Sequence, residues 1–307
     1  MTYYKIELNL AAELVKTATD ITEWFRVHGF ESFQKEDKSP VTLADYASQL
    51  FIVKKLKEKF PNDQIIAEES YNSHLDINVQ NIIKRCYRSL ELDLIEDIER
   101  ILNYRGPYSP RQWTVDPIDG TKGFQKNLSY AVGIGFMNNS ELIAAAIGIP
   151  NYNEKGSALF IAEKNQGARV SYGGEDFIPI SVTDKKDIKK AKMCHSLHYD
   201  EPWVMEFAEI AEVRNYIQMD SMAKFCMVAD GTADLYIKPM DENRSFSWDF
   251  LPGILIVNEA GGIVSDLKGN NIKFNNEKCI ITAPGLVASN GFLHEEILKY
   301  LKDIDFY

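Results

Sequence analysis

The second half of the chain alternates between short apolar runs and longer helical segments, and this alternation most constrains its fold. Strands are predicted in "AKMCHSL" from residue 191, "NYIQM" from 215, "ADLYIK" from 233, "GIVSD" from 262 and "CIITA" from 279. Helices are predicted near residues 203–213, 222–229, 248–260 and 293–301. Such alternation favours an α/β layered arrangement. Each junction between a strand and the helix after it is a natural ligand site.

The first half shows a different pattern, which favours an α+β arrangement. The apolar residues Leu10, Leu14, Ala18, Ile21 and Phe25 recur every three or four positions, as on the buried face of an amphipathic helix. A second helix is predicted from a cap at residue 42 to about residue 60, and residues 75–104 are expected to be mostly helical. Pro40 predicts a loop in "FQKEDKSPVT".

Six strand candidates complete the first half. They lie in "DQIIAEES", in "QWTVD" and at residues 130–137, 142–149, 158–162 and 168–170. The runs "AVGIGF" and "LIAAAIGI" are small and apolar, as expected of a sheet covered on at least one face. The turn-rich segment "YGGEDFIPISVTDKKD" predicts a boundary between subdomains at 1–180 and 181–307. A length of 307 residues is more than one core usually holds.

The net charge of −11 excludes a pure nucleic-acid binder, which needs a basic surface. No apolar run is long enough to cross a bilayer, and Glu7 and Glu13 stand where a signal peptide would be apolar. We therefore expect a cytoplasmic protein that has no membrane or nucleic-acid partner, and we expect a monomer.

The cysteines also indicate a reducing compartment. The four of them lie far apart, without the spacing of a zinc site, and are expected to be free buried thiols: Cys86, Cys194, Cys226 and Cys279.

Acidic residues gather at the predicted strand ends and helix starts. They are Asp45, Glu68, Glu69, Asp116, Asp119 and Asp249. Each one alone has an ordinary explanation, since Asp-Gly is a common turn pair and an aspartate can cap a helix. Together they predict a cation site.

The motif "WTVDPIDGTKGF" gives this site its chemistry. Pro117 restricts the turn between Asp116 and Asp119, so both carboxylates can point to one side. Mg²⁺ prefers oxygen ligands, and two such ions can hold the attacking and leaving oxygens of a phosphoryl transfer. We expect a helix to begin at Gly120 and Thr121, whose backbone N–H groups would face an anion. The motif therefore predicts metal-assisted phosphate hydrolysis.

Three motifs together resemble the inositol monophosphatase superfamily of magnesium-dependent, lithium-sensitive phosphomonoesterases. They are "AEES" at 67–70, "DPIDGT" at 116–121 and "WDFLPGILIVNEAGG" at 248–262. The resemblance spans nearly the whole chain and implies the αβαβα layered sandwich that this superfamily shares with fructose-1,6-bisphosphatase. One departure is Leu251 before Pro252, where the family usually has a smaller residue.

Further segments resemble the 3′(2′),5′-bisphosphate nucleotidase branch. They are "KSPVTLADYASQ" at 38–49, "GTKGF" at 120–124 and "ADLYIKP" at 233–239. The resemblance implies removal of the 3′-phosphate from adenosine 3′,5′-bisphosphate to give AMP, with 3′-phosphoadenylyl sulfate as a further substrate. It also leaves an inositol polyphosphate 1-phosphatase or an inositol monophosphatase open.

The resemblance also implies roles for individual residues. It assigns two or three Mg²⁺ ions to Glu68, Asp116, Asp119, Asp249 and the carbonyl oxygen of Ile118, with Glu69 the poorer candidate of its pair. Asp45 and Thr121 would hold and polarise the attacking water. The small-molecule substrate would contact Gly120, Thr121, His195, Ser221, Lys224 and Lys238, with His198 as the alternative histidine. Relatives have arginine where Lys238 stands, and lysine loses the bidentate grip on a phosphate.

Other classes are weighed against this one. Haloacid-dehalogenase phosphatases also use aspartates near "DGT", but with one residue between the aspartates, where this chain has Pro117 and Ile118. A nucleotide-binding P-loop is excluded because no GxxxxGK[ST] motif is present. A non-enzymatic metal-dependent sensor is disfavoured by the complete set of carboxylates.

Overall fold

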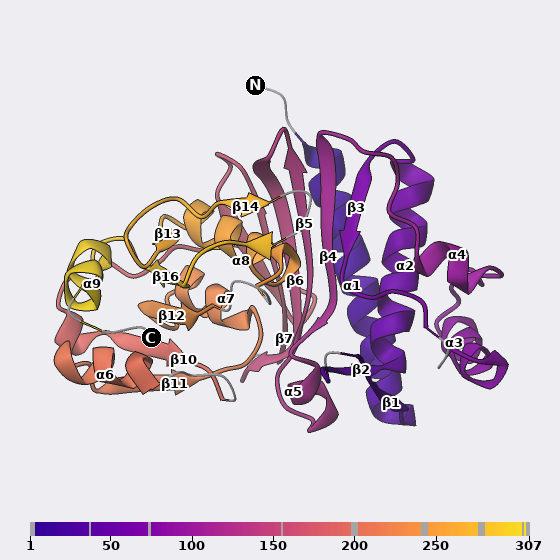
Figure 1. Cartoon of the computed structure of the whole chain (residues 1–307), viewed down its shortest axis with the longest axis horizontal. Helices are drawn as coiled ribbons and strands as arrows, with labels where there is room; N and C mark the ends of the chain where they lie inside the picture. The colour runs from indigo at the N-terminus through magenta and orange to yellow at the C-terminus, as the bar shows by residue number, and fades with distance from the viewer. Residues whose placement is uncertain are drawn as a thin grey trace.

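Five layers of helices and sheets follow one another along the long axis of the molecule (Figure 1). They come from a computed structural model that describes residues 4–36, 38–72, 75–154, 156–197, 202–240, 245–275, 280–302 and 304. From one end to the other, the layers are a helical layer, a large sheet, a second helical layer, a small sheet and a third helical layer. This arrangement confirms the predicted αβαβα sandwich.

The first layer contains the two long N-terminal helices, α1 (Lys5–His28) and α2 (Leu43–Lys59). Thr42 caps α2: its hydroxyl oxygen accepts from the Ala44 N–H, and the Asp45 carboxylate accepts from the Thr42 N–H. This reciprocal capping box confirms the predicted start of the helix and places Asp45 in its first turn. Two shorter helices, α3 (Ile77–Ser89) and α4 (Ile98–Leu102), lie beside α2 (Figure 1).

The large sheet has seven strands in the order β3-β4-β5-β6-β7-β8-β9. β3 (Gln64–Ala67) runs parallel to β4 (Arg111–Asp119), and every later pair is antiparallel. The remaining strands are β5 (Ala131–Asn138), β6 (Glu141–Asn153), β7 (Gly156–Glu163), β8 (Ala168–Tyr172) and β9 (Ile178–Pro179). The parallel β3–β4 pair brings the ends of "AEES" and "WTVD" to one edge.

The small sheet has five strands in the order β11-β10-β12-β16-β13. β10 (Lys192–His195) is parallel to β11 (Asn215–Gln218) and to β12 (Leu235–Pro239), as expected of alternating strands and helices. β16 (Gly285–Ser289) is antiparallel to β12 and to β13 (Ile263–Asp266). Helices α7 (Ala223–Ala229) and α8 (Ser247–Glu259) lie between the sheets, and α6 (Pro202–Ile210) and α9 (His294–Leu301) cover the outer face (Figure 1).

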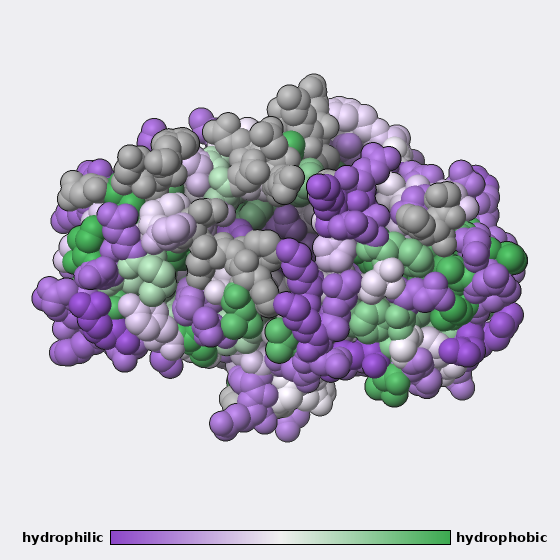
Figure 2. Space-filling view, turned by 60° about the horizontal axis from the view of Figure 1, so that its bottom comes forward, coloured by the Kyte–Doolittle hydropathy of each residue, from purple (hydrophilic) through white to green (hydrophobic). Residues whose placement is uncertain are grey.

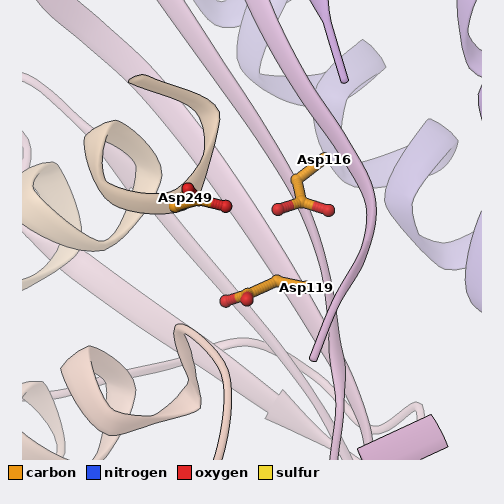
Figure 3. A group of neighbouring side chains, drawn as sticks. All are labelled: Asp116, Asp119 and Asp249. Atoms are coloured by element: carbon orange, nitrogen blue, oxygen red, sulfur yellow. The ribbon is translucent and has the colours of Figure 1, made fainter. Parts of the chain in front are cut away.

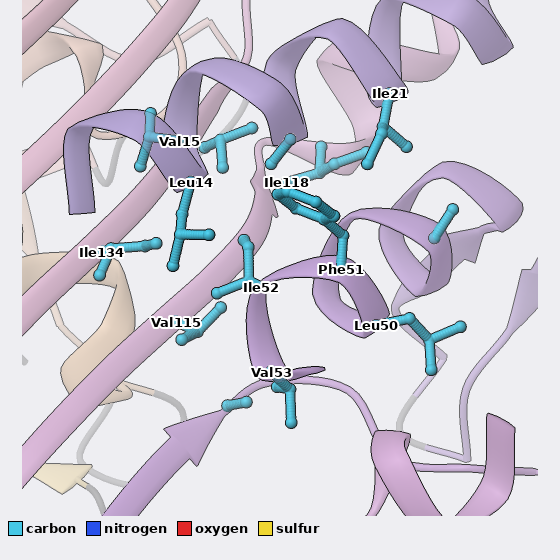
Figure 4. Packing of buried hydrophobic residues seen from close by; sticks show 14 of the residues in the cluster. Leu14, Val15, Ile21, Leu50, Phe51, Ile52, Val53, Val115, Ile118 and Ile134 are labelled. Carbon is cyan, nitrogen blue, oxygen red and sulfur yellow. The ribbon is translucent and has the colours of Figure 1, made fainter. Parts of the chain in front are cut away.

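Apolar side chains fill the spaces between the layers. Leu14, Val15 and Ile21 of α1 pack with Ile52 of α2 and Val115 of β4, all nearly inaccessible to solvent (Figure 4). On the other face of the sheet, Gly133 of β5 lies so close to α7 that an added Cβ would be 2.5 Å from the Met222 sulfur. The small residues of "AVGIGF" therefore allow the middle helical layer to approach the large sheet.

Several elements differ from the sequence predictions. The segment predicted as a loop before α2 forms a hairpin of β1 (Ser32–Gln34) and β2 (Pro40–Thr42), in which Pro40 begins an edge strand. The helical prediction for 75–104 was wrong between residues 90 and 97, where Glu91 has a positive φ of 55°. Among the described residues of "CIITA", β15 (Ile280–Ile281) pairs with β14 (Phe274–Asn275) and bridges Phe246, and the strand of the small sheet is instead β16.

The surface and the cysteines agree with the composition. One face carries many hydrophilic residues and has a hollow near its middle, in which both hydrophilic and hydrophobic residues are visible (Figure 2). Cys86, Cys194 and Cys226 are buried thiols, and Cys279 lies outside the described residues. Within the described ranges, no helix has both the length and the apolar composition required to span a membrane.

Candidate active site

Three aspartates from two distant parts of the chain meet between the sheets. Asp116 and Asp119 lie at the end of β4, and Asp249 lies in the first turn of α8. Their side chains point toward one another (Figure 3), and one carboxylate oxygen from each lies within 4.8 Å of the others. The structure thus brings together three of the metal ligands predicted from the motifs.

The Asp116 carboxylate has a free ligand atom. Its Oδ1 accepts from the Ile118 N–H at 3.1 Å, but its buried Oδ2 has no hydrogen-bond partner. Burial raises the pKa of Asp116 well above its ordinary value, and the charges of Glu68, Asp119 and Asp249 raise it further. A buried oxygen without a partner among like charges fits a bound cation, which would balance both costs.

Asp119 and Asp249 lie in the same electrostatic environment. Burial raises the pKa of Asp119 to about 6, although the charge of Lys224 and the Met222 N–H, which donates to Asp119 Oδ2, act in the opposite direction. Burial and the charge of Asp119 raise the pKa of Asp249 well above its ordinary value. The buried Leu251 and Pro252 follow Asp249 on α8, and the bulkier Leu251 does not remove this aspartate from the cluster.

Glu68 follows β3 and forms an ion pair with Lys35 of the β1–β2 hairpin. The Lys35 ammonium lies 2.8 Å from Glu68 Oε1 and 2.6 Å from Glu69 Oε1. Burial lowers the pKa of Lys35, but the two glutamates more than offset this effect, so the pKa lies above its ordinary value. Glu68 stays accessible, with 23 % of its side chain exposed, whereas only 3 % of the Glu69 side chain is exposed.

Asp45 and Thr121 lie beside the cluster and contact each other. The Thr121 hydroxyl lies 3.3 Å from Asp45 Oδ1 and 3.2 Å from the Ile118 carbonyl oxygen. Asp45 Oδ2 accepts from the Thr42 hydroxyl at 2.6 Å and from the Thr42 N–H at 2.8 Å. Burial raises the pKa of Asp45 to about 7, in spite of the bonds from Thr42. A carboxylate with this pKa suits general-base chemistry near neutral pH.

Two residues with left-handed backbone connect the site to α7. Gly120, with φ of 90°, precedes the predicted helix, which is the five-residue α5 (Thr121–Gln125). Ser221, with φ of 66°, lies directly opposite, since a Cβ added to Gly120 would be 3.3 Å from the Ser221 Cβ. A non-glycine residue in this region is strained and is held by its surroundings.

The expected phosphate-binding lysines also converge on the cluster. Lys224 is only 4 % exposed, and its Nζ lies 5.4 Å from the centre of the Tyr236 ring. Burial and the charge of Lys238 lower the pKa of Lys224. Since Lys224 and Lys238 both lower the pKa of Asp119, their charges act at the aspartate cluster.

His195 lies at the end of β10, and its ring meets Tyr216 edge to face at 5.8 Å. His198, the alternative histidine, is outside the described residues.

The sequence motifs did not identify Lys35 or Met222. Lys35 is a lysine in a polar segment, and nothing in its sequence neighbours indicates that it folds over "AEES". Met222 acts through its backbone N–H, which leaves no signal in the type of side chain.

Comparison with known proteins assigns this chain to a family. Residues 3–305 match the model of the inositol monophosphatase family. The chain is 30% identical over 300 residues to a 3′(2′),5′-bisphosphate nucleotidase of Schizosaccharomyces pombe, which covers 86% of this chain and 84% of the relative. It is 29% identical to a nucleotidase of the same name from Emericella nidulans, over 98% of this chain and 99% of the relative.

The solved structures show the same fold. An IMPase from Thermotoga maritima superposes with a TM-score of 0.71 and 21% identity, covering 97% of each chain. The fold is therefore that of an α/β sandwich, and the family model and the curated relatives make the protein a phosphatase of this class. It belongs to the inositol monophosphatase family, whose enzymes depend on magnesium, and within it to the bisphosphate nucleotidase branch.

Proposed function

We propose that this chain removes the 3′-phosphate of adenosine 3′,5′-bisphosphate and releases AMP and phosphate. The reaction would require Mg²⁺ and be inhibited by lithium, and 3′-phosphoadenylyl sulfate would be a further substrate. The observation that carries the proposal is the buried, unpartnered Asp116 Oδ2 among three convergent aspartates, next to the positive charges of Lys224 and Lys238. The names of the relatives support this choice of substrate.

The cation ligands would be carboxylates from three elements. Asp116 would contact two ions, and Glu68, Asp119, Asp249 and the carbonyl oxygen of Ile118 would complete the set for two or three Mg²⁺. When bound, Mg²⁺ supplies Lewis-acid stabilisation of the negative charge that develops on the phosphoryl oxygens. Without this cation, burial and mutual repulsion raise the pKa values of Asp116, Asp119 and Asp249.

Asp45 and Thr121 would handle the proton of the attacking water. The Thr121 hydroxyl donates a hydrogen bond to Asp45 Oδ1, which leaves its oxygen able to accept a hydrogen bond from the water. As the water attacks, its proton would pass to the Thr121 oxygen while the Thr121 proton passes to Asp45. The bonds from Thr42 to the other oxygen of Asp45 hold the carboxylate in this orientation. The water would attack phosphorus opposite the 3′-oxygen, with no phosphoenzyme.

Two lysines near the aspartate cluster give a reason to prefer a substrate with two phosphate groups. Lys224 is buried at the start of α7, and Lys238 lies on β12 of the same small sheet. The charges of Asp119 and Asp220 stabilise the buried ammonium, and a second phosphate group would give it a charge-assisted partner on the substrate. We propose that Lys224, Lys238 and Ser221 contact this group and that His195 contacts the base.

Inositol 1,4-bisphosphate is the alternative substrate, because it also carries two phosphates. The test is phosphate release by the purified protein with Mg²⁺, from each substrate separately, with and without millimolar Li⁺. We expect faster turnover of the nucleotide and inhibition by Li⁺. Faster turnover of the inositol compound would keep the metal site but reject the nucleotide contacts, and a trapped acyl-phosphate would reject the mechanism.

A further inference from the structure

Gln49 is a buried residue of α2 that the proposed chemistry does not use. It lies one turn after Asp45 and is completely inaccessible to solvent. Its Nε2 donates to the Glu69 carbonyl oxygen at 2.6 Å, and the Glu69 N–H donates to its Oε1 at 2.7 Å. The side-chain amide thus pairs with both backbone groups of one residue, as a neighbouring strand would.

Arg105 holds the same backbone group from the other side. Its Nη2 donates to the Glu69 carbonyl oxygen at 2.8 Å, and its Nη1 donates to the Leu102 carbonyl oxygen at 2.8 Å beside α4. Strand β3 ends at Ala67, and the Glu68 N–H still donates to the Val115 carbonyl oxygen of β4 at 3.2 Å. Beyond this bond, the Gln49 and Arg105 side chains hold the backbone of residue 69.

This contact joins two parts of the candidate active site. Glu68, a proposed metal ligand, directly precedes the residue that Gln49 holds. Asp45, the proposed base, lies one turn before Gln49 on the same helix. Because α2 is rigid and the Gln49 amide holds the backbone next to Glu68, these contacts set the distance between the proposed metal ligand, Glu68, and the proposed base, Asp45.

We propose that Gln49 is a positioning residue, which holds the Glu68 segment in the geometry that binds the cation. This inference rests on the proposed role of Glu68 as a metal ligand. Removal of a group that orients a metal ligand typically weakens metal binding by ~10- to 100-fold. A side chain with a purely structural role would change the stability of the fold and leave the metal affinity unchanged.

The experiment compares Gln49→Met with a matched control, Gln112→Met. Gln112 is also buried, with 3 % exposed, and its Nε2 donates to Gln64 Oε1 at 2.9 Å near the opposite end of the β3–β4 pair. The dissociation constant for Mg²⁺ is measured by calorimetry on the full chain without substrate, and the stability of each variant by urea unfolding in EDTA. We expect Gln49→Met to weaken Mg²⁺ binding by ~10-fold or more, whereas Gln112→Met binds as the unchanged protein does.

Arg105→Met gives an independent measurement if Gln49→Met does not fold. It should also weaken Mg²⁺ binding. In the double variant, the loss of Mg²⁺ binding free energy should be smaller than the sum of the two single losses, because both side chains hold one carbonyl. Folded variants that bind Mg²⁺ as tightly as the unchanged chain would overturn the proposal. An unchanged chain that does not bind Mg²⁺ would instead reject the proposed function, and this inference with it.

Discussion

The backbone N–H of Met222 donates to Asp119 Oδ2, joining residues that are 103 positions apart in the sequence. Asp119 ends a strand of the large sheet, and Met222 precedes α7, which packs on the small sheet. The contact is possible because Ser221 adopts a left-handed backbone that turns the N–H toward the carboxylate. The candidate metal site is therefore built across the two sheets, and its carboxylates can be tested one at a time.

Asp116→Asn should abolish turnover while stabilising the metal-free fold. The amide cannot replace a carboxylate ligand, so kcat/KM is expected to fall by roughly 1,000-fold or more. This loss corresponds to the several kcal/mol by which a metal stabilises the transition state. In the metal-free protein the neutral amide removes a buried like charge, so the urea midpoint in EDTA should rise. Asp20→Asn, at an exposed position on α1, is the matched control and should change neither quantity. A lower midpoint for Asp116→Asn would contradict the repulsion inferred for this cluster.

Asp45 and Thr121 should behave as one functional unit. Asp45→Asn places an amide donor toward the threonine hydroxyl, and Thr121→Ala removes that hydroxyl. Each change should lower kcat by ~100- to 10,000-fold, and the double variant should be no worse than the weaker single variant. Thr121→Ser keeps the hydroxyl and should retain most activity. Multiplicative losses in the double variant would show that the two residues act separately.

The stability of the metal-free protein should fall as pH rises. Burial raises the pKa of Asp45 to about 7 and that of Asp119 to about 6, so the folded state holds these protons more tightly than the unfolded state does. Their contribution is complete below pH ~4, the ordinary carboxyl pKa, and is lost as pH rises through 6 and 7. The free energy of unfolding in EDTA should therefore decrease by ~1.4 kcal/mol per pH unit for each proton that the folded state still binds and the unfolded state has released.

Magnesium provides the control for this pH dependence. In excess Mg²⁺ the deprotonated carboxylates are the ligands, so the decrease between pH 5.5 and 8 should disappear or reverse. Asp45→Asn should reduce the slope in EDTA, because the amide does not titrate. An equal slope in EDTA and in Mg²⁺ would show that these carboxylates do not couple to a cation.

Lys224→Met should separate substrates by their number of phosphates. If Lys224 holds the second phosphate, its loss removes a charge-assisted contact and should raise KM for adenosine 3′,5′-bisphosphate by ~10- to 100-fold. The KM for adenosine 3′-monophosphate and the Mg²⁺ affinity should change little. Lys192→Met, at an exposed position on β10, is the control. An equal rise in KM for both nucleotides would place Lys224 at the scissile phosphate instead.

Local patterns in the sequence were enough to predict most elements. The start of α2 follows from Thr42 and Asp45 three residues apart, because the capping box is a local interaction. The convergence of Asp116, Asp119 and Asp249 follows from motifs whose spacing reflects a shared fold. The division of the chain at residue 180 stays a prediction, and so do the roles of the individual site residues.

Contacts between distant segments could not be predicted from these patterns. Strand β16 is short and follows Pro284, and its place in the small sheet depends on pairing with β12 and β13. Gln49 is 20 residues from Glu69, and any buried glutamine in a helix would look the same in the sequence. Lys35 reaches Glu68 only because the hairpin folds back over the end of β3. These contacts depend on tertiary geometry, which composition and periodicity do not encode.

The small sheet and the helix next to it carry His195, Ser221, Lys224 and Lys238, whereas Asp116 and Asp119 belong to the large sheet. A substitution on the small sheet can therefore alter the choice of substrate while the catalytic centre keeps its chemistry. A methyl group added at Gly133 would instead lie 2.5 Å from the Met222 sulfur, so the Met222 side chain would have to move beside the aspartate cluster. Diversification of substrate preference is thus expected to follow β10, α7 and β12, with the "DPIDGT" strand as the invariant partner.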